Sequence, residues 1–269
     1  MEKSDQDSLL FAGVDVGASR TKAVLVDRFG KLLGHGVLKS GIDFADTAGR
    51  SLQLALNAAG AAAGSLSRCV ATGYGRHNAA EAGSTKTEIA CHAKGCYFLF
   101  ARSMTVIDIG GQDNKIIKLD SLGRRVDFRM NRKCAAGTGA FLEEMAQRLD
   151  LDLEDMDPLA RQSEQMVELG SFCTVFSATE VLENIRQGRK IEDIVKGVFH
   201  SMLKRILEMD TLEGTVVMTG GVVAHNPYLS DMAAAMTGKE ILIPPFPQLT
   251  GALGAALYGL EMECGSDVA

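Results

Sequence analysis

The sequence predicts an α/β protein with two lobes, and three observations lead to this expectation. Strand-like and helix-like segments alternate along the chain, which is the pattern of α/β architectures. The 269 residues are enough for two compact lobes. The strand, glycine turn and strand of residues 9–27 return at residues 104–120, each time with an aspartate, Asp15 or Asp108, two residues before a glycine. We interpret the last feature as a weak duplication of topology rather than a sequence repeat.

The first lobe is expected to comprise residues 1–103 and to be closed by a helix at 249–262. Apolar runs at 9–17 and 21–27 predict two strands that form a hairpin around "GASR". The remaining elements of this lobe are a strand at 31–39, a helix at 46–64 that ends at Gly64, and a strand at 68–75. The glycine and alanine residues of the closing helix permit close packing.

The second lobe is expected to comprise residues 104–248. After the strand–turn–strand unit, the apolar spacing predicts helices at 134–149, 173–188 and 191–209 and a strand at 215–221 that ends in a glycine turn. The chain contains no low-complexity segment or long linker, so the lobes must be joined by short crossings.

Composition excludes several classes of function. The formal net charge of −6 and the pI of about 5.4 leave no clustered basic excess for nucleic acid. No apolar run approaches the roughly 18–20 residues of a membrane span. The first residues, "MEKSDQDS", are polar and acidic, unlike a signal or transit peptide. We therefore expect a cytoplasmic protein.

The cysteines are candidates for ligands rather than for disulfides. Six occur, at positions 69, 91, 96, 134, 173 and 264, and a large chain without an export signal is expected to keep them reduced. Cys134 and Cys173 each come just before a helical pattern, so both are expected at helix starts. Cys91 and Cys96, with His92 alongside, could form a metal pair, but no second pair lies at zinc-finger spacing. We expect Cys69, before a strand start, and Cys264, in a polar tail, to be bystanders.

Three glycine turns follow apolar strands, in "DVGASRTK", "DIGGQD" and "MTGGV". Such turns expose backbone N–H groups and let a phosphate approach without a Cβ clash. Asp15 and Asp108 would suit a magnesium ion, and Ser19 and Lys22 could contact phosphate oxygens. One such turn is usually only a turn, but three in this order favour a nucleotide site. Neither the Walker loop nor the Rossmann fingerprint is present.

This ordered set of turns, with the closing "GALGAAL", resembles the ATPase superfamily of actin, Hsp70 and sugar kinases. The resemblance implies two ribonuclease-H-like lobes with a nucleotide cleft between them. More narrowly, "ATGYGR", "VIDIGGQD", "KCAAGTG", "CTVF" and "VVMTGGV" look like the activator components of 2-hydroxyacyl-CoA dehydratases and their relatives, the ATPase subunits of benzoyl-CoA reductases. The resemblance covers roughly residues 10–260, with the motifs in the family's order.

The resemblance implies an ATPase that donates a single low-potential electron to an iron–sulfur dehydratase or reductase and receives it from a ferredoxin or flavodoxin. It also implies a homodimer with one 4Fe–4S cluster, to which each subunit contributes Cys134 and Cys173. Four thiolates complete such a cluster, and helix N-termini would stabilise its negative charge. On the residues alone, two inert packing thiols are an equally good interpretation.

The resemblance also implies the residues of an ATP, ADP and Mg²⁺ site. Asp108 or Gln112 is expected to orient the attacking water, since either can reach a γ-phosphate from its turn. The expected nucleotide contacts are Asp15, Gly17, Ala18, Ser19, Arg20, Thr21, Lys22, Gly110, Gly111, Gly137, Gly220 and Gly221.

Two other functions fit the same fold. One is a small-molecule kinase of the N-acetylglucosamine type, although no sugar-binding insertion is evident and a kinase has no use for Cys134 and Cys173. The other is a non-catalytic actin-like assembly protein. Only the activator should be brown when it is purified without oxygen.

Overall fold

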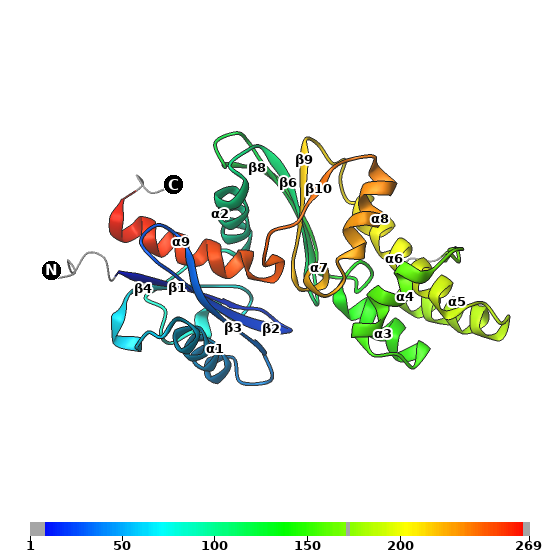
Figure 1. Ribbon diagram of the computed structural model, residues 1–269, viewed down its shortest axis with the longest axis horizontal. Helices are drawn as coiled ribbons and strands as arrows, with labels where there is room; N and C mark the ends of the chain where they lie inside the picture. Colours follow the sequence, from blue (N-terminus) through cyan, green and yellow to red (C-terminus); the bar gives the residue numbers. More distant parts are fainter. Residues whose placement is uncertain (1–8, 171–172, 266–269) are drawn as a thin grey trace. The chain divides into compact units, whose positions relative to one another are not determined.

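The structure of this protein is a computed structural model that describes residues 9–170 and 173–265. Contacts divide the described residues into two units. Unit 1 holds residues 9–102, 119–125 and 248–265, and unit 2 holds residues 103–118 and 126–247. Figure 1 shows the helices and strands of both.

Unit 1 is a five-stranded sheet in the order β3-β2-β1-β4-β5, with a helix against each face. Its strands are β1 (Leu10–Val16), β2 (Arg20–Val26), β3 (Leu32–Lys39), β4 (Leu66–Thr72) and β5 (Ser84–Thr85). Its helices are α1 (Phe44–Ala59), α2 (Glu88–Phe100) and α9 (Thr250–Cys264). β1 pairs antiparallel with β2 and parallel with β4, so the predicted hairpin around "GASR" is confirmed.

Alternate residues of β1 enter two different cores, as the period of two of a strand requires. Val14 and Val16 join the core beneath α1, whereas Phe11 joins the core beneath α9. The approach of α9 is close because a Cβ on Gly13 would lie 1.9 Å from the Ala252 carbonyl oxygen. The predicted close packing of this helix is therefore confirmed.

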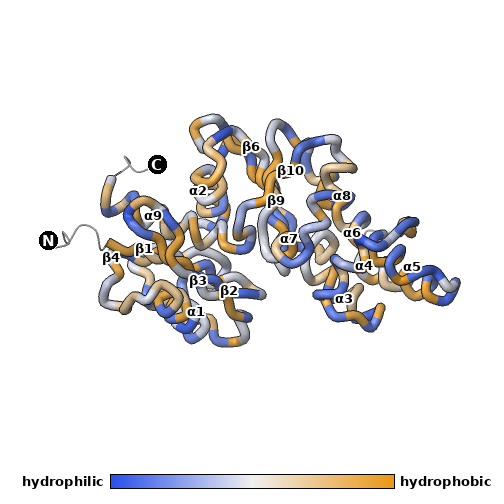
Figure 2. Tube along the Cα trace, in the orientation of Figure 1, coloured by the Kyte–Doolittle hydropathy of each residue, from blue (hydrophilic) through white to orange (hydrophobic). Residues whose placement is uncertain are grey.

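Unit 2 contains a second five-stranded sheet, in the order β10-β9-β6-β7-β8. Its strands are β6 (Met104–Ile109), β7 (Asn114–Leu119), β8 (Arg125–Asn131), β9 (Thr215–Thr219) and β10 (Ile241–Leu242). Its helices are α3 (Gly139–Leu149), α4 (Met156–Gln162), α5 (Thr174–Arg186), α6 (Ile191–Leu207), α7 (Gly221–His225) and α8 (Tyr228–Thr237). One core joins β6 and β9 to α3 and α6 through Ile107, Met218, Phe141 and Phe199. Figure 2 shows the hydrophobic character of the central strands, β9 in this unit and β1 in unit 1.

The two sheets share one topology. Replacing β1, β2, β3, β4 and β5 by β6, β7, β8, β9 and β10 converts the first strand order into the second. β1 pairs in parallel with β4 as β6 pairs with β9. The duplication of topology predicted from the two Asp-containing turns is confirmed.

The described residues also contain short 3-10 turns, and three boundaries differ from those expected. The 3-10 turns are Ala63–Ser65, Arg76–Asn78, Leu153–Asp155 and Pro247–Leu249. The helix expected to end at Gly64 ends instead at Ala59, because Gly60 takes the left-handed conformation (φ 64°) and its N–H caps the helix. The strand expected at 68–75 is β4, and Cys69 lies buried inside it rather than before it. α3 begins at Gly139 and not at Cys134.

Several elements were not expected from the sequence, above all α2, β8 and α8.

No helix in the part of the chain that the structure describes combines the length and the apolar character that a membrane crossing needs.

Candidate functional site

The first candidate turn follows β1, at the end of which Asp15 is almost fully buried. Lys22 donates from Nζ to Asp15 Oδ2 at 2.9 Å, and the β1–β2 register places these two residues opposite each other. Asp15 Oδ1 is buried and has no hydrogen-bond partner among the described residues. A buried carboxylate oxygen without a donor is costly, so this oxygen suits a bound cation or a water molecule held by one.

Ser40 ties down the turn between β1 and β2. Its Oγ donates to the Gly17 carbonyl oxygen at 2.6 Å, and its N–H donates to the Ser19 carbonyl oxygen at 3.0 Å. The Thr21 hydroxyl is buried beside the Ser40 hydroxyl at 2.9 Å, whereas Ala18 and Arg20 are exposed. The backbone of the turn and the side chains of Ala18 and Arg20 are therefore available to a ligand from solvent, whereas the Thr21 side chain is buried in the protein.

The second candidate turn follows β6 and repeats this geometry. Lys115, seven residues after Asp108 as Lys22 is seven after Asp15, donates to Asp108 Oδ2 at 3.1 Å and to Asp113 Oδ1 at 2.7 Å. The Lys115 side chain is fully buried. The Gly110 N–H donates to the Asp113 carbonyl oxygen at 2.9 Å, and Gln112 is exposed in the turn.

A Thr-Gly pair on the neighbouring parallel strand lies beside each aspartate. Thr72 is paired with Asp15 and Thr219 with Asp108. A Cβ on the glycine that follows would lie 2.5 Å from Asp15 Oδ1 at Gly73, and 2.7 Å from Asp108 Oδ1 at Gly220. Both glycines have positive φ angles, 89° and 101°, so only glycine leaves this space open without strain. Each unit thus carries a buried carboxylate, a lysine and an open glycine corner, a donor set suited to phosphate and Mg²⁺.

Cys134 lies in a loop that the side chain of Asn131 holds in place. Asn131 Nδ2 donates to the carbonyl oxygens of Cys134 at 2.9 Å and Ala136 at 3.2 Å, and Asn131 Oδ1 accepts the Cys134 N–H at 3.2 Å. The expectation that Cys134 starts a helix is wrong, since α3 begins five residues later at Gly139. The loop, not a helix terminus, determines the position of this half-buried thiol.

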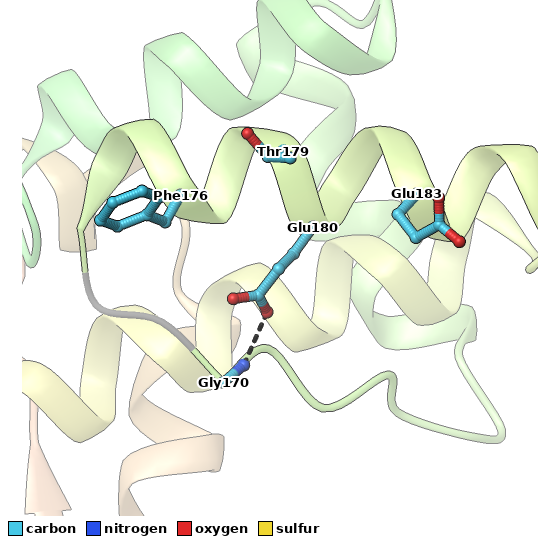
Figure 3. A pocket seen from close by; sticks show the side chains of 5 residues that line it. All are labelled: Gly170, Phe176, Thr179, Glu180 and Glu183. Atoms are coloured by element: carbon cyan, nitrogen blue, oxygen red, sulfur yellow. Dashed lines mark hydrogen bonds between the residues drawn. The ribbon is translucent and has the colours of Figure 1, made fainter.

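Cys173 is the N-cap residue of α5 and is exposed, which confirms the expected helix start. Residues 171–172 lie outside the described residues. Gly170 N–H donates to Glu180 Oε2 at 2.7 Å, across a shallow pocket that Phe176 and Glu183 also line (Figure 3). Glu180 therefore holds the end of the preceding segment against the helix that Cys173 begins.

The other cysteines lie in unit 1, and three of them are buried. Burial raises the pKa of Cys69 to about 12 and that of Cys91 to about 12. Cys91 and Cys96 lie on α2 five residues apart, which puts them about 140° apart around a helix. The two thiols do not share a helix face, so the C-x4-C spacing does not make a chelating pair. Cys264 is the exposed last residue of α9.

Sequence reasoning missed Lys115, Asn114 and Asn131. The seven-residue interval from Asp108 to Lys115 matches that from Asp15 to Lys22 and could have identified the first. Asn114 donates from Nδ2 to the Gly137 carbonyl oxygen at 2.9 Å, so Gly137, expected to contact nucleotide, is buried against Asn114. No local pattern marks the two asparagines, because their partners depend on how the loop folds back.

Comparisons with known proteins identify the family and the fold. A family model described as the BadF/BadG/BcrA/BcrD ATPase family matches residues 12–259. The activator of lactoyl-CoA dehydratase of Anaerotignum propionicum is 42% identical over 252 residues, 93% of this chain and 96% of the relative. The solved structure of the activator of 2-hydroxyisocaproyl-CoA dehydratase from Clostridium difficile, with bound ADPNP, superposes with a TM-score of 0.89 at 37% identity and covers 96% of each chain.

A more distant solved structure shows how widely the fold is shared. A ROK family glucokinase from Streptomyces griseus, in complex with glucose and AMPPNP, has a TM-score of 0.58 at 13% identity and covers 93% of this chain and 99% of its own. At that identity the likeness is one of fold alone. The predicted fold class and the predicted relationship to the dehydratase activators are both confirmed.

Proposed function

The chain belongs to the BadF/BadG/BcrA/BcrD ATPase family, and we propose that it is an ATP-dependent reductive activator of an iron–sulfur dehydratase or reductase. The relatives named as dehydratase activators support the class of partner. One observation carries the proposal. Cys134 and Cys173, neither of which is fully buried, both lie in unit 2, the unit that also carries the Gly110–Gly111 turn.

ATP hydrolysis is proposed to use the two Asp-containing turns. Water attacks the γ-phosphorus of ATP, the bond to the β,γ-bridging oxygen breaks, and ADP and inorganic phosphate leave. Asp108 or Gln112 orients the water, and the ion pair with Lys115 holds the Asp108 side chain in one position. Asp15, with a buried oxygen that has no partner among the described residues, fits a Mg²⁺ ion or its water. Lys22 and the turn at 17–20 contact the phosphates, as do Gly110, Gly111, Gly220 and Gly221.

The two cysteines of unit 2 are proposed as half of the ligand set of a 4Fe–4S cluster. A bound cluster supplies one-electron redox chemistry at low potential. Cys134 and Cys173 offer two thiolates, and two copies of the chain offer the four that the cluster takes. Asn131 fixes the backbone on both sides of Cys134, so the chain presents this thiol from a defined loop. The electron donor is proposed to be a ferredoxin or flavodoxin.

The test starts with protein purified without oxygen. We expect a brown protein with about two iron atoms and about two sulfides per chain, since one 4Fe–4S cluster, with four of each, is shared by two chains in the proposal. Cys134→Ser and Cys173→Ser should each lose the iron. Cys264→Ser, an exposed cysteine of unit 1, is the matched control and should keep it.

The second arm measures electron transfer to a purified dehydratase of the lactoyl-CoA type. Reduction should require a reduced donor and hydrolysable ATP, and ADPNP should not sustain it. A colourless protein that keeps ATPase activity, or transfer that proceeds equally without ATP, contradicts the proposal. Phosphorylation of N-acetylglucosamine at the rate of ATP consumption would instead identify the kinase alternative.

A further inference from the structure

Three hydrogen bonds join the Gly110–Gly111 turn region to the segment that follows Cys134. The Gly139 N–H donates to the Gly110 carbonyl oxygen at 2.9 Å, and the Ala140 N–H donates to the Gly111 carbonyl oxygen at 2.8 Å. Asn114, at the start of β7, donates from Nδ2 to the Gly137 carbonyl oxygen at 2.9 Å. All of these residues lie in unit 2.

The contact leaves little room for the two segments to move independently. A Cβ on Gly137, where φ is 85°, would lie 2.8 Å from Asn114 Nδ2. A Cβ on Gly139 would lie 3.0 Å from the Gly111 Cα. Both glycines are buried, as is Asn114. Because packed backbone transmits displacement rather than absorbing it, a shift of the turn is passed to residues 137–140.

Asn131 extends the connection to the thiol. Its amide holds Cys134 through both the backbone N–H and the carbonyl oxygen, and it also holds Ala136. Thr138 Oγ1 donates to the Ala135 carbonyl oxygen at 2.7 Å. Hydrogen bonds therefore tie residues 134–138 into one short loop that leads directly to Gly139 and Ala140.

Asn114 uses its side-chain donor but not its side-chain acceptor. Its Oδ1 is buried and has no hydrogen-bond partner among the described residues. A buried amide that satisfies its donor but leaves its acceptor unpaired gains free energy if a shift of the turn supplies a donor. Coupling needs an element with two arrangements, and this amide lies where the two segments meet.

We propose that Asn114 is a positioning residue that couples occupancy of the Gly110–Gly111 turn to the position of the Cys134 thiol. The inference rests on the proposed function, because it takes the phosphates of ATP as the ligand of the turn. When they occupy the turn, Asn114 and the two backbone hydrogen bonds shift residues 137–140 and, through them, Cys134. Without the Asn114 donor the turn still binds nucleotide, but only the two backbone hydrogen bonds remain, and the response of the thiol is smaller.

The experiment follows the thiol itself, in full-length chain freed of iron, so that no cluster is needed. Iodoacetamide labelling of Cys134 is timed by peptide mass spectrometry, with and without Mg²⁺ and ADPNP. In the wild-type chain we expect ADPNP to change the Cys134 rate by at least about fivefold, the lower end of usual coupling. Asn114→Ala and the isosteric Asn114→Asp, which lacks the amide donor, should bind ADPNP with an affinity within about twofold of wild type and show a clearly smaller change in the Cys134 rate than wild type.

Asn226→Ala is the matched control. Asn226 is also a buried asparagine of unit 2, its Nδ2 donates to the Val222 carbonyl oxygen at 3.0 Å, and its Oδ1 also lacks a partner among the described residues. This variant should lose comparable stability and keep the labelling response. If both Asn114 variants fail to fold, hydrogen exchange at the Gly139 and Ala140 amides of the wild-type chain serves instead, and ADPNP should change it.

The outcomes separate the two proposals. Wild-type chain that binds ADPNP without any change at Cys134, or Asn114 variants that respond like wild type, overturns the coupling inference and leaves the ATPase site standing. Wild-type chain that binds no ADPNP overturns the proposed nucleotide site and the inference with it. An equally reduced response in Asn226→Ala would show that instability, not the loss of the Asn114 donor, reduces it.

Discussion

At the scale of single residues, the two units differ in how deeply the lysine of each turn is buried. Lys115 is fully buried between Asp108 and Asp113, whereas Lys22 keeps some exposure beside Asp15. Removing one partner from a buried ion pair leaves an uncompensated charge away from water. The duplicated geometry therefore allows a matched comparison within one chain.

Lys115→Met is expected to lower the free energy of unfolding by ~3–5 kcal/mol, because the carboxylates of Asp108 and Asp113 would remain charged without the lysine that pairs with them. Lys22→Met should lower the free energy of unfolding by less, because the Lys22 side chain is partly exposed and water can take over part of its role beside Asp15. Urea denaturation of both variants, followed by circular dichroism, measures the difference. Equal losses would show that burial of the lysine does not decide the cost.

The buried cysteines of unit 1 predict a loss of stability at alkaline pH. The folded protein raises the pKa of Cys69 and of Cys91 from 9.0 to about 12 through burial. Each thiol therefore contributes stability that is complete below about pH 9 and is lost as the pH rises toward 12, by up to ~1.4 kcal/mol per pH unit. Cys91→Val should flatten the decline of unfolding free energy between about pH 9 and pH 11. If the unfolding free energies of wild type and Cys91→Val fall in parallel between about pH 9 and pH 11, burial does not raise the pKa of Cys91 as described.

At the scale of elements, the corner between β9 and α7 sets the space beside Asp108. Gly220 has φ of 101°, and a Cβ there would lie 2.3 Å from the Ile109 carbonyl oxygen. At Gly221, the next residue, a Cβ meets no atom within 4 Å. Two adjacent glycines thus have opposite tolerance for a side chain.

Gly220→Ala is expected to lower the free energy of unfolding by ~1–3 kcal/mol, because it adds backbone strain and displaces Asp108. Gly221→Ala should leave stability within about 0.5 kcal/mol of wild type. Thermal or urea unfolding of the pair provides the measurement. If Gly220→Ala leaves the free energy of unfolding unchanged, the backbone at this corner relaxes to accommodate a Cβ, and stability does not depend on the open space beside Asp108.

At the scale of the whole molecule, the arrangement of cysteines predicts the state of association. Unit 2 of one chain supplies two cysteines, and α5, which Cys173 begins, exposes the apolar side chains of Val175, Phe176, Leu182 and Ile185. A second copy is the source of the two missing thiolates in the proposed function.

Light scattering of iron-loaded protein should therefore give twice the chain mass of 28.7 kDa. Cys134→Ser should shift the population toward the monomer, since it removes the proposed cluster ligands that would join the two chains. A loaded protein that remains a monomer at all concentrations, with four irons in one chain, would require other ligands.

The sequence by itself determined the features that depend on neighbours along the chain. Strand periodicity and the glycine turns predicted the β1–β2 and β6–β7 units, and the recurrence of Asp-x-Gly predicted that the two sheets repeat one topology. The composition of α9 predicted its close approach to the sheet. The ordered motifs were sufficient to identify the family, because each comes from one short stretch of chain.

Only the tertiary structure decided which of these residues meet. Cys134 and α3 are separated because Asn131 and Asn114 hydrogen-bond the intervening loop into a folded turn, a contact across 23 residues in the case of Asn114 and Gly137. Likewise, the sequence left open whether Cys91 and Cys96 form a metal pair, and their positions on α2 place them on different faces of the helix. Such contacts depend on where distant backbone comes to lie, and local propensity carries no information about that position.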